Sequence, residues 1–166
     1  MSLMLSFNLF AFEALPTAQN VDVARYIGKW YTITSLPQFF TRSCVGQTAE
    51  YGILNEKQIS VHNVCIKDNG KTTDIHGVGT VKDAPNNARL SIMFDQFWLK
   101  LLKIKGEYVI IKLSDGYDSV LVGSTNRKSL WVLSRTPAID PAALEDYLAL
   151  AKKLGFKTQK LEESKY

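Results

Sequence analysis

The sequence lacks most of the features that mark catalytic, metal-binding or membrane-spanning proteins. Only two of its 166 residues are cysteine and two are histidine, and it has no C-x-x-C spacing, no H-x-x-x-H spacing and no glycine-rich phosphate loop. Its carboxylates show no spacing typical of a paired acid and base. No apolar run reaches the roughly 18 residues needed to cross a bilayer as a helix. These absences predict a protein with no metal, no cofactor and no catalytic residues.

A strong excess of charge of one sign is also missing. The formal net charge is +4, and residues 1–83 are balanced, with 7 Lys and Arg against 7 Asp and Glu. Residues 84–166 carry the whole excess, 13 against 9. A mild basic bias favours anionic surfaces such as phospholipid head groups, but a stripe of basic residues is lacking. Nucleic acid is therefore not an expected partner.

The length and the hydrophobic content of 46% predict one globular domain, which we place at residues 21–166. Residues 1–20 are expected to be an N-terminal extension, either a remnant of a secretory signal or an added segment. Their apolar run from Leu3 to Phe12 has no preceding Lys or Arg, and Glu13 and Pro16 follow it.

Short β-type runs separated by turn residues dominate the chain. Asn69-Gly70 and Asp115-Gly116 predict tight reversals between such runs. Eight strands at short spacing indicate an all-β antiparallel barrel or sandwich. The predicted strands are residues 29–36, 45–54, 57–67, 73–82, 88–95, 107–114, 117–124 and 128–135.

One helix is predicted after the last strand. Asp140 is a suitable N-cap, Pro141 suits the first turn, and Gly155 is suited to end the helix. Apolar residues recur on one face, which should pack against the outside of the barrel wall. They are Leu144, Tyr147, Leu148, Ala151 and Leu154.

Three separated motifs resemble the signatures of the lipocalins, and within them the bacterial outer-membrane lipocalin and apolipoprotein D group. Gly28-Lys29-Trp30-Tyr31 is similar to the first signature, G-x-W. Ser114-Asp115 with Val120-Leu121-Val122 is similar to the second, although Gly116 stands where tyrosine is usual. The segment from Trp131 to Pro137 is similar to the third. The resemblance covers about residues 21–156.

The resemblance implies an eight-stranded antiparallel up-and-down β-barrel with one C-terminal α-helix packed on the outside. It also implies a floor in which Arg135 stacks on Trp30, next to Gly28. Such a cation–π contact is worth about 0.5–2 kcal/mol. The role of these three residues is structural.

Strand alternation, placed by the resemblance, gives a mainly apolar ligand cavity inside the barrel. Gly77 and Gly79 are expected to leave volume unfilled there, and Tyr51 and Asn63 are the candidates for bonding a polar head group or ordered water. Phe39 and Phe40 lie on the first long loop, which in this family folds over the open end. The expected ligand-binding residues are Phe39, Phe40, Ala49, Tyr51, Ile53, Val61, Asn63, Ile75, Gly77, Leu90, Ile92, Phe94, Val122 and Trp131.

The cysteines Cys44 and Cys65 lie on either side of a hairpin centred near Glu56, so a small bulge would bring them within bridging distance. A disulfide would indicate an oxidising compartment. The alternative is a reactive thiol in a cup-based enzyme, an isomerase or a peroxide-reducing protein. The two histidines, His62 and His76, are expected to point outward, and no metal site is expected.

The segment Phe97 to Lys105 is both apolar and basic. Phe97, Trp98, Lys100 and Lys103 form a candidate membrane contact, because aromatic rings and lysines favour the head-group region. Alternatively, these residues pack on the helix or on a second subunit, so a homodimer stays open.

The function expected from the resemblance and the apolar inward set is binding, storage or transport of a hydrophobic small molecule, such as a fatty acid or lysophospholipid. The protein is expected in the periplasm or at the outer membrane, or alternatively secreted. Besides the cysteine enzyme, a third reading is an interaction protein that recognises a partner through its loops.

Overall fold

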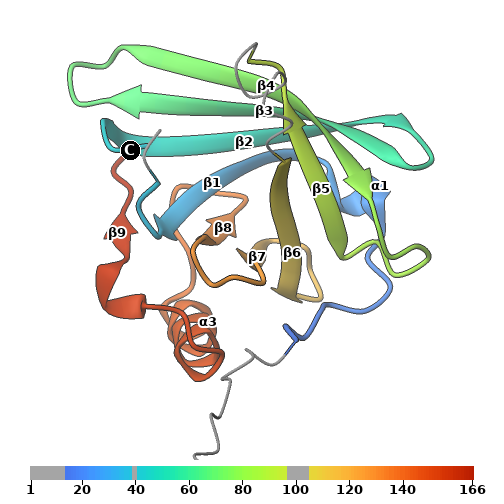
Figure 1. Cartoon of the computed structure of the whole chain (residues 1–166). Coiled ribbons are helices and arrows are strands. Elements are labelled where there is room, and N and C mark those ends of the chain that lie inside the picture. The colour runs from blue at the N-terminus through green and yellow to red at the C-terminus, as the bar shows by residue number, and fades with distance from the viewer. Residues whose placement is uncertain (1–13, 39–40, 97–104) are drawn as a thin grey trace, which may run out of the picture.

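The computed structural model describes residues 14–38, 41–96 and 105–166 and forms a closed eight-stranded antiparallel β-barrel with one long helix outside it (Figure 1). This is the predicted fold, and all eight strands lie within two residues of their predicted ends. They are β1 (Gly28–Ser35), β2 (Cys44–Asn55), β3 (Gln58–Lys67), β4 (Thr72–Val81), β5 (Arg89–Phe94), β6 (Lys105–Leu113), β7 (Ser119–Gly123) and β8 (Leu130–Ser134).

Strand β1 closes the barrel. Each other strand pairs with its neighbours in sequence, and β1 pairs with β2 on one side and with β8 on the other. The pairing of β1 with β2 runs from Gly28 opposite Tyr51 to Tyr31 opposite Thr48. Beyond that point β2 diverges, and the short strand β9 (Glu162–Glu163) pairs with the last two residues of β1. Strands β2 and β9 therefore pair with successive parts of β1, on the side away from β8.

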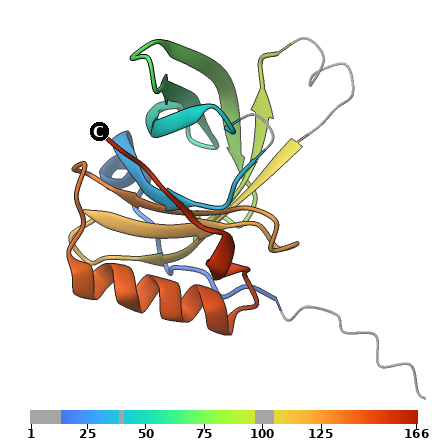
Figure 2. The same ribbon diagram turned by 90° about the vertical axis from the view of Figure 1, so that its left-hand side faces the viewer.

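Two apolar cores lie on the two sides of the same wall, because successive residues of a strand face opposite ways. On β6, Ile110 points into the barrel, whereas Val109 and Ile111 point outward under helix α3 (Pro141–Lys153). The helix runs along the outside of the barrel (Figure 2). Every residue of β7 is buried, since both of its faces are covered.

Helix α3 begins and ends as its sequence predicts. The Asp140 carboxylate accepts a hydrogen bond from the Ala143 amide, and Pro141 is the first helical residue. Gly155 follows the helix with a φ of +89°, a conformation that glycine adopts without strain. Tyr147 and Ala151 are buried, and Leu144, Leu148 and Leu154 pack around them.

Three short elements were not predicted: helix α1 (Val23–Tyr26), the 3₁₀ turn η1 (Thr158–Lys160) and β9. Each is too short to show a periodic pattern, and tertiary contacts hold it in place. The chain before α1 also packs on the barrel: Leu15 is buried with the outer core, and the Ala18 amide donates to the Ile110 carbonyl.

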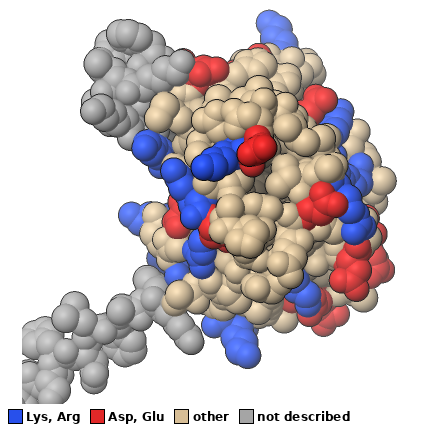
Figure 3. Space-filling view, turned by 90° about the vertical axis from the view of Figure 1, so that its right-hand side faces the viewer, with Lys and Arg blue, Asp and Glu red and all other residues tan. Residues whose placement is uncertain are grey.

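Basic and acidic side chains are interspersed over the face of the molecule seen in Figure 3, which fits a net charge of only +4. Within residues 14–38, 41–96 and 105–166, the helices are too short or too polar to cross a membrane.

Candidate functional site

The barrel is closed at one end by a floor built on Trp30. The Trp30 side chain is fully buried, and the Arg135 guanidinium carbon lies 3.7 Å from the ring centroid. The indole N–H donates to the Tyr26 carbonyl at 2.9 Å. Arg135 also donates to the carbonyls of Lys29, Arg25 and Tyr26. One side chain thus ties the start of β1 to the residues that precede it.

Gly28, Arg25 and Tyr117 complete this floor. Gly28 has a φ of +93°, and a Cβ there would lie 3.4 Å from Arg135 Nη1, so glycine suits this close approach. The Arg25 guanidinium lies 4.0 Å from the Tyr117 ring centroid, and the Tyr117 hydroxyl accepts from the Asp22 amide. Neither Arg25 nor Tyr117 was predicted from the sequence to belong to the floor. In the second motif Gly116 stands where tyrosine is usual, and the aromatic ring of Tyr117 follows one residue later.

A cavity of about 470 Å³ lies inside the barrel. It falls within the range of roughly 300–1,000 Å³ that is typical of small-molecule pockets. Eight of the residues expected to bind ligand are among those that line it. They are Ala49, Tyr51, Val61, Asn63, Ile75, Ile92, Phe94 and Trp131.

The remaining expected ligand residues lie elsewhere. Leu90 and Val122 are buried in the inner core, next to the cavity-lining residues but not among them. Phe39 and Phe40 lie outside the described residues, as do Phe97, Trp98, Lys100 and Lys103 of the candidate membrane contact.

The prediction for Ile53 is wrong. Its side chain is 53% exposed and faces solvent rather than the cavity. The reason is the unequal length of two neighbouring strands: β1 begins opposite Tyr51, so β2 continues past the barrel floor without that neighbour. The pairing with β3 also becomes irregular after Ile53. Strand alternation predicts which face of β2 carries the Ile53 side chain, but it does not predict at which residue β2 leaves the barrel interior.

The expectation that Gly77 and Gly79 leave volume unfilled is also wrong. A Cβ at Gly77 would lie 2.7 Å from the Met93 carbonyl oxygen, and one at Gly79 would lie 3.0 Å from side-chain atoms of Ile59 and Ile92. Neighbouring strands occupy the space that the missing side chains provide. Glycine at positions 77 and 79 allows the strands and side chains to pack closely, and these two positions do not enlarge the cavity.

The cavity is more polar at its mouth than the sequence predicted. Ala49, Val61, Ile92 and Leu133 line it on the floor side, whereas hydrophilic residues line the end where the β7–β8 turn lies. There the Glu107 carboxylate accepts from the Thr125 amide and hydroxyl. The residues of this polar collar are Gln38, Thr41, Gln47, Thr73, Asp74, Gln96, Lys105, Glu107, Ser124, Asn126 and Ser129.

Three tyrosines form a hydrogen-bonded group near the bottom of the cavity. The hydroxyls of Tyr26 and Tyr108 lie 2.6 Å apart, and the Tyr51 hydroxyl donates to that of Tyr108 at 3.2 Å. Higher on the wall, Asn63 Oδ1 is buried and accepts no hydrogen bond from any described residue. Of the two residues predicted to contact a polar head group, Tyr51 already donates to Tyr108, whereas Asn63 has a free acceptor oxygen among the described residues.

The tyrosine group predicts a loss of stability in alkaline solution. Burial raises the pKa of Tyr51 to about 12 and raises those of Tyr26 and Tyr108 well above their usual value of 10. The fold favours the neutral hydroxyl, so this stabilisation is complete below pH 10 and is lost as the pH rises through 12. Between pH 8 and 11, Tyr51 alone should remove about 1.4 kcal/mol from the free energy of unfolding.

Urea denaturation at both pH values measures this loss, and Tyr51→Phe is the matched variant. The variant should lose less stability between pH 8 and 11 than the wild type does. An equal loss in both proteins would contradict the role of Tyr51.

A disulfide joins Cys44, at the start of β2, to Cys65, near the end of β3, as predicted. The pairing of the two strands shifts between Cys44 and Gly46, which is the expected bulge. Neither cysteine is a free thiol, so the structure offers no nucleophile to the cysteine-enzyme alternative.

A second depression, of about 660 Å³, lies on the outside of helix α3. It is a broad surface hollow next to Leu144, Leu148 and Thr158, and it contains none of the expected ligand residues. The interior cavity is therefore the candidate site.

Comparison with known proteins gives three results. A family model described as a lipocalin-like domain matches residues 21–166. Outer membrane lipoprotein Blc of Escherichia coli (strain K12) is 32% identical over 150 residues, which cover 89% of this chain and 81% of that protein. Apolipoprotein D of Bos taurus is 27% identical over 132 residues, covering 76% and 67%.

Among solved structures, lobster apocrustacyanin A1 aligns with a TM-score of 0.64, over 95% of this chain and 92% of that one. Its sequence identity is 15%, so the likeness concerns the fold alone.

Proposed function

We propose that this chain, which belongs to the lipocalin family, holds one amphipathic lipid, such as a fatty acid or lysophospholipid, in its cup without chemical turnover. Members of the family bind small hydrophobic molecules in general, and the finer assignment rests on the cavity of about 470 Å³. Its floor side is apolar and its mouth is polar. An acyl chain would be desolvated at the apolar floor side, and its head group would contact the polar collar at the mouth.

The energetics support a chain-like ligand. Burying each methylene is worth about 0.8 kcal/mol before the costs of ordering and association are subtracted. Charges of both signs line the cavity, with Lys105 against Glu107 and Asp74. This mixture suits a zwitterionic head group, and Lys105 offers a partner to an anionic one. Asn63 Oδ1 would accept a hydrogen bond from a donor on the ligand.

We further propose a location in the cell envelope. The Blc relatives from Escherichia coli and Vibrio cholerae are named outer membrane lipoproteins. The Cys44–Cys65 disulfide supports the same location, because disulfides persist in oxidising compartments such as the periplasm.

Filling the cup should abolish lipid uptake. Asn63 and Ile75 are directly opposed on β3 and β4, and both line the cavity. The double variant Asn63→Trp/Ile75→Trp should bind a fluorescent fatty acid at least tenfold more weakly, a loss of about 1.4 kcal/mol. Val78→Trp, on the outward face of β4, is the matched control and should bind like the wild type.

Native mass spectrometry of the purified protein, followed by organic extraction, identifies the natural ligand class. A co-purifying lipid that is absent from the double variant is the expected result. Unchanged lipid uptake by a correctly folded double variant would show that the cup is not the binding site.

A further inference from the structure

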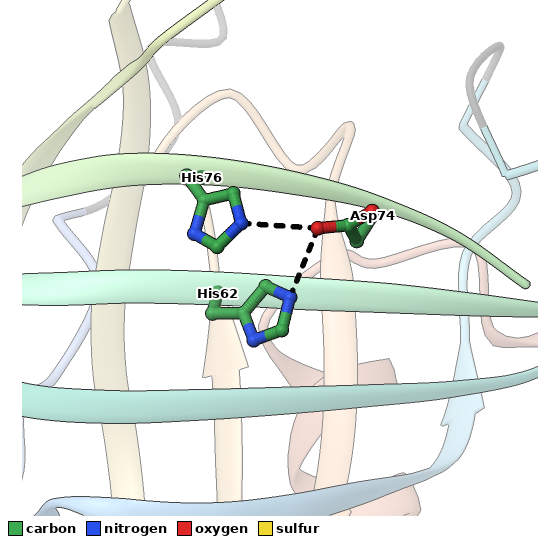
Figure 4. A group of neighbouring side chains, drawn as sticks. All are labelled: His62, Asp74 and His76. Atoms are coloured by element: carbon green, nitrogen blue, oxygen red, sulfur yellow. Dashed lines mark hydrogen bonds and ion pairs between the residues drawn. The ribbon is translucent and has the colours of Figure 1, made fainter.

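The outer wall of the barrel carries a compact group of three potential metal ligands: His62 on β3, and Asp74 and His76 on β4 (Figure 4). His62 and His76 are the only histidines in the sequence. They are directly opposed in the β3–β4 pairing, and Asp74 lies two residues before His76, so all three side chains leave the same face. The cavity-lining residues Asn63 and Ile75 alternate along the strands with these positions, and Asp74 is itself also among the residues that line the cavity.

The ligand atoms converge on one point. Nε2 of His62 and Nε2 of His76 lie 3.2 Å and 3.0 Å from the same oxygen, Oδ2 of Asp74. The two imidazole rings are stacked, with centroids 4.3 Å apart and planes inclined by 2°. All three ligand atoms lie within 4.8 Å of one another. Both rings therefore present the same edge to the carboxylate.

These separations match those around a tetrahedral metal ion. Bonds of about 2.0–2.1 Å place neighbouring ligand atoms of a tetrahedral zinc site roughly 3.4 Å apart. The observed nitrogen–oxygen separations of 3.0 and 3.2 Å need to widen only slightly to admit an ion. The two stacked rings would turn about their side-chain bonds to direct both nitrogens at one ion, which exchanges a hydrogen-bonded group for a coordinated one.

The site is accessible, and its donors select the class of metal. The side chains of His62, Asp74 and His76 are 35%, 53% and 58% exposed, so an ion can enter from solvent. Two imidazole nitrogens and one carboxylate oxygen suit Zn²⁺, Cu²⁺ or Ni²⁺, whereas Ca²⁺ and Mg²⁺ prefer all-oxygen sites. Glu50 lies opposite His62 on β2, and its side chain is exposed.

We propose that His62, Asp74 and His76 bind one divalent transition-metal ion, with Zn²⁺ as the probe of choice, on the outer face of the barrel. The ion joins β3 to β4 by side chains and leaves one position for water or a further ligand. The metal site would share Asp74 with the lining of the cup, and it does not require a bound lipid.

Zinc titration by calorimetry of tag-free, chelator-treated full chain tests the proposal. The wild type should bind one Zn²⁺ per chain, and Mg²⁺ should not bind at the same concentration. Asp74→Asn and the double variant His62→Gln/His76→Gln should each bind Zn²⁺ at least tenfold more weakly. Asp68→Asn, in the turn of the same hairpin, is the matched control and should bind as the wild type does.

A second measurement reports the ligands themselves. Because the chain has two histidines, Cu²⁺ bound at this site should show coupling to two imidazole nitrogens in electron paramagnetic resonance. Saturable zinc binding that survives in the double histidine variant would overturn the proposal. Failure of the folded wild type to bind at a tenfold excess of Zn²⁺ would overturn it equally.

Discussion

Replacing Trp30 with alanine should lower the free energy of unfolding by about 3–5 kcal/mol, as expected for removing a large, fully buried aromatic side chain. Trp30 is 0% exposed and packs between Tyr26 and the Arg135 guanidinium. The substitution creates a cavity, removes the cation–π contact and leaves the Tyr26 carbonyl without its indole donor. For a domain of this size, the midpoint temperature should fall by about 6–20 °C.

Urea denaturation followed by circular dichroism measures this effect independently of tryptophan fluorescence. Trp131→Phe is the matched control, because Trp131 is only partly buried and lines the cavity rather than the floor. The control should lose markedly less stability than Trp30→Ala. A comparable loss in the two variants would indicate that the floor has no special role.

The contribution of the stack itself can be separated with a double-mutant cycle between Trp30→Phe and Arg135→Lys. Arg135 donates to several backbone carbonyls as well as covering the ring, so a single substitution mixes the two effects. The coupling energy should be about 0.5–2 kcal/mol. A coupling energy near zero would assign the stabilisation to the hydrogen bonds of Arg135 alone.

Removing the disulfide is the second change with a large expected effect. Cys44 and Cys65 are 21 residues apart, and closing a loop of this length should stabilise the fold by about 3 kcal/mol through the entropy of the unfolded chain. The variant Cys44→Ser/Cys65→Ser should unfold at a correspondingly lower urea concentration. Cys65 is among the residues that line the cavity, but neither cysteine belongs to the inner core, so the variant should still bind lipid.

Wild-type protein in reducing buffer is the control for this variant, and the two should have similar stability. A difference of less than about 1 kcal/mol between oxidised and reduced wild-type protein would contradict the expected contribution. Weaker lipid binding by the well-folded serine variant would show that the disulfide also shapes the mouth of the cup.

The fold could be predicted from the sequence because local signals and long-range motifs agreed. Alternation fixed the strands, and Asp140, Pro141 and Gly155 fixed the helix ends. The Trp30–Arg135 contact followed from motifs about a hundred residues apart. By contrast, Ile53 was misplaced because the end of the barrel interior depends on where β1 begins, which alternation along β2 does not contain.

The polar collar and the histidine group were missed for another reason. Collar residues such as Gln38 and Ser129 lie outside regular strands, where no period assigns a side chain to the interior. His62, Asp74 and His76 lie on two strands, so their proximity depends on the pairing register. The tight turn at Asn69-Gly70 sets the pairing register of β3 and β4, and this register places His62 opposite His76.

The position of β1 has a consequence for the making of the protein. Its second long partner, β8, begins at Leu130, roughly 95 residues after β1 ends at Ser35. At about 5–20 residues per second, a ribosome needs roughly 5–20 s to add that length. Throughout this interval the edge of β1 that will pair with β8 remains unpaired, and an unpaired edge is a template for association with other chains. We therefore expect the nascent chain to be protected by a chaperone or to complete its folding only after the last strand has emerged.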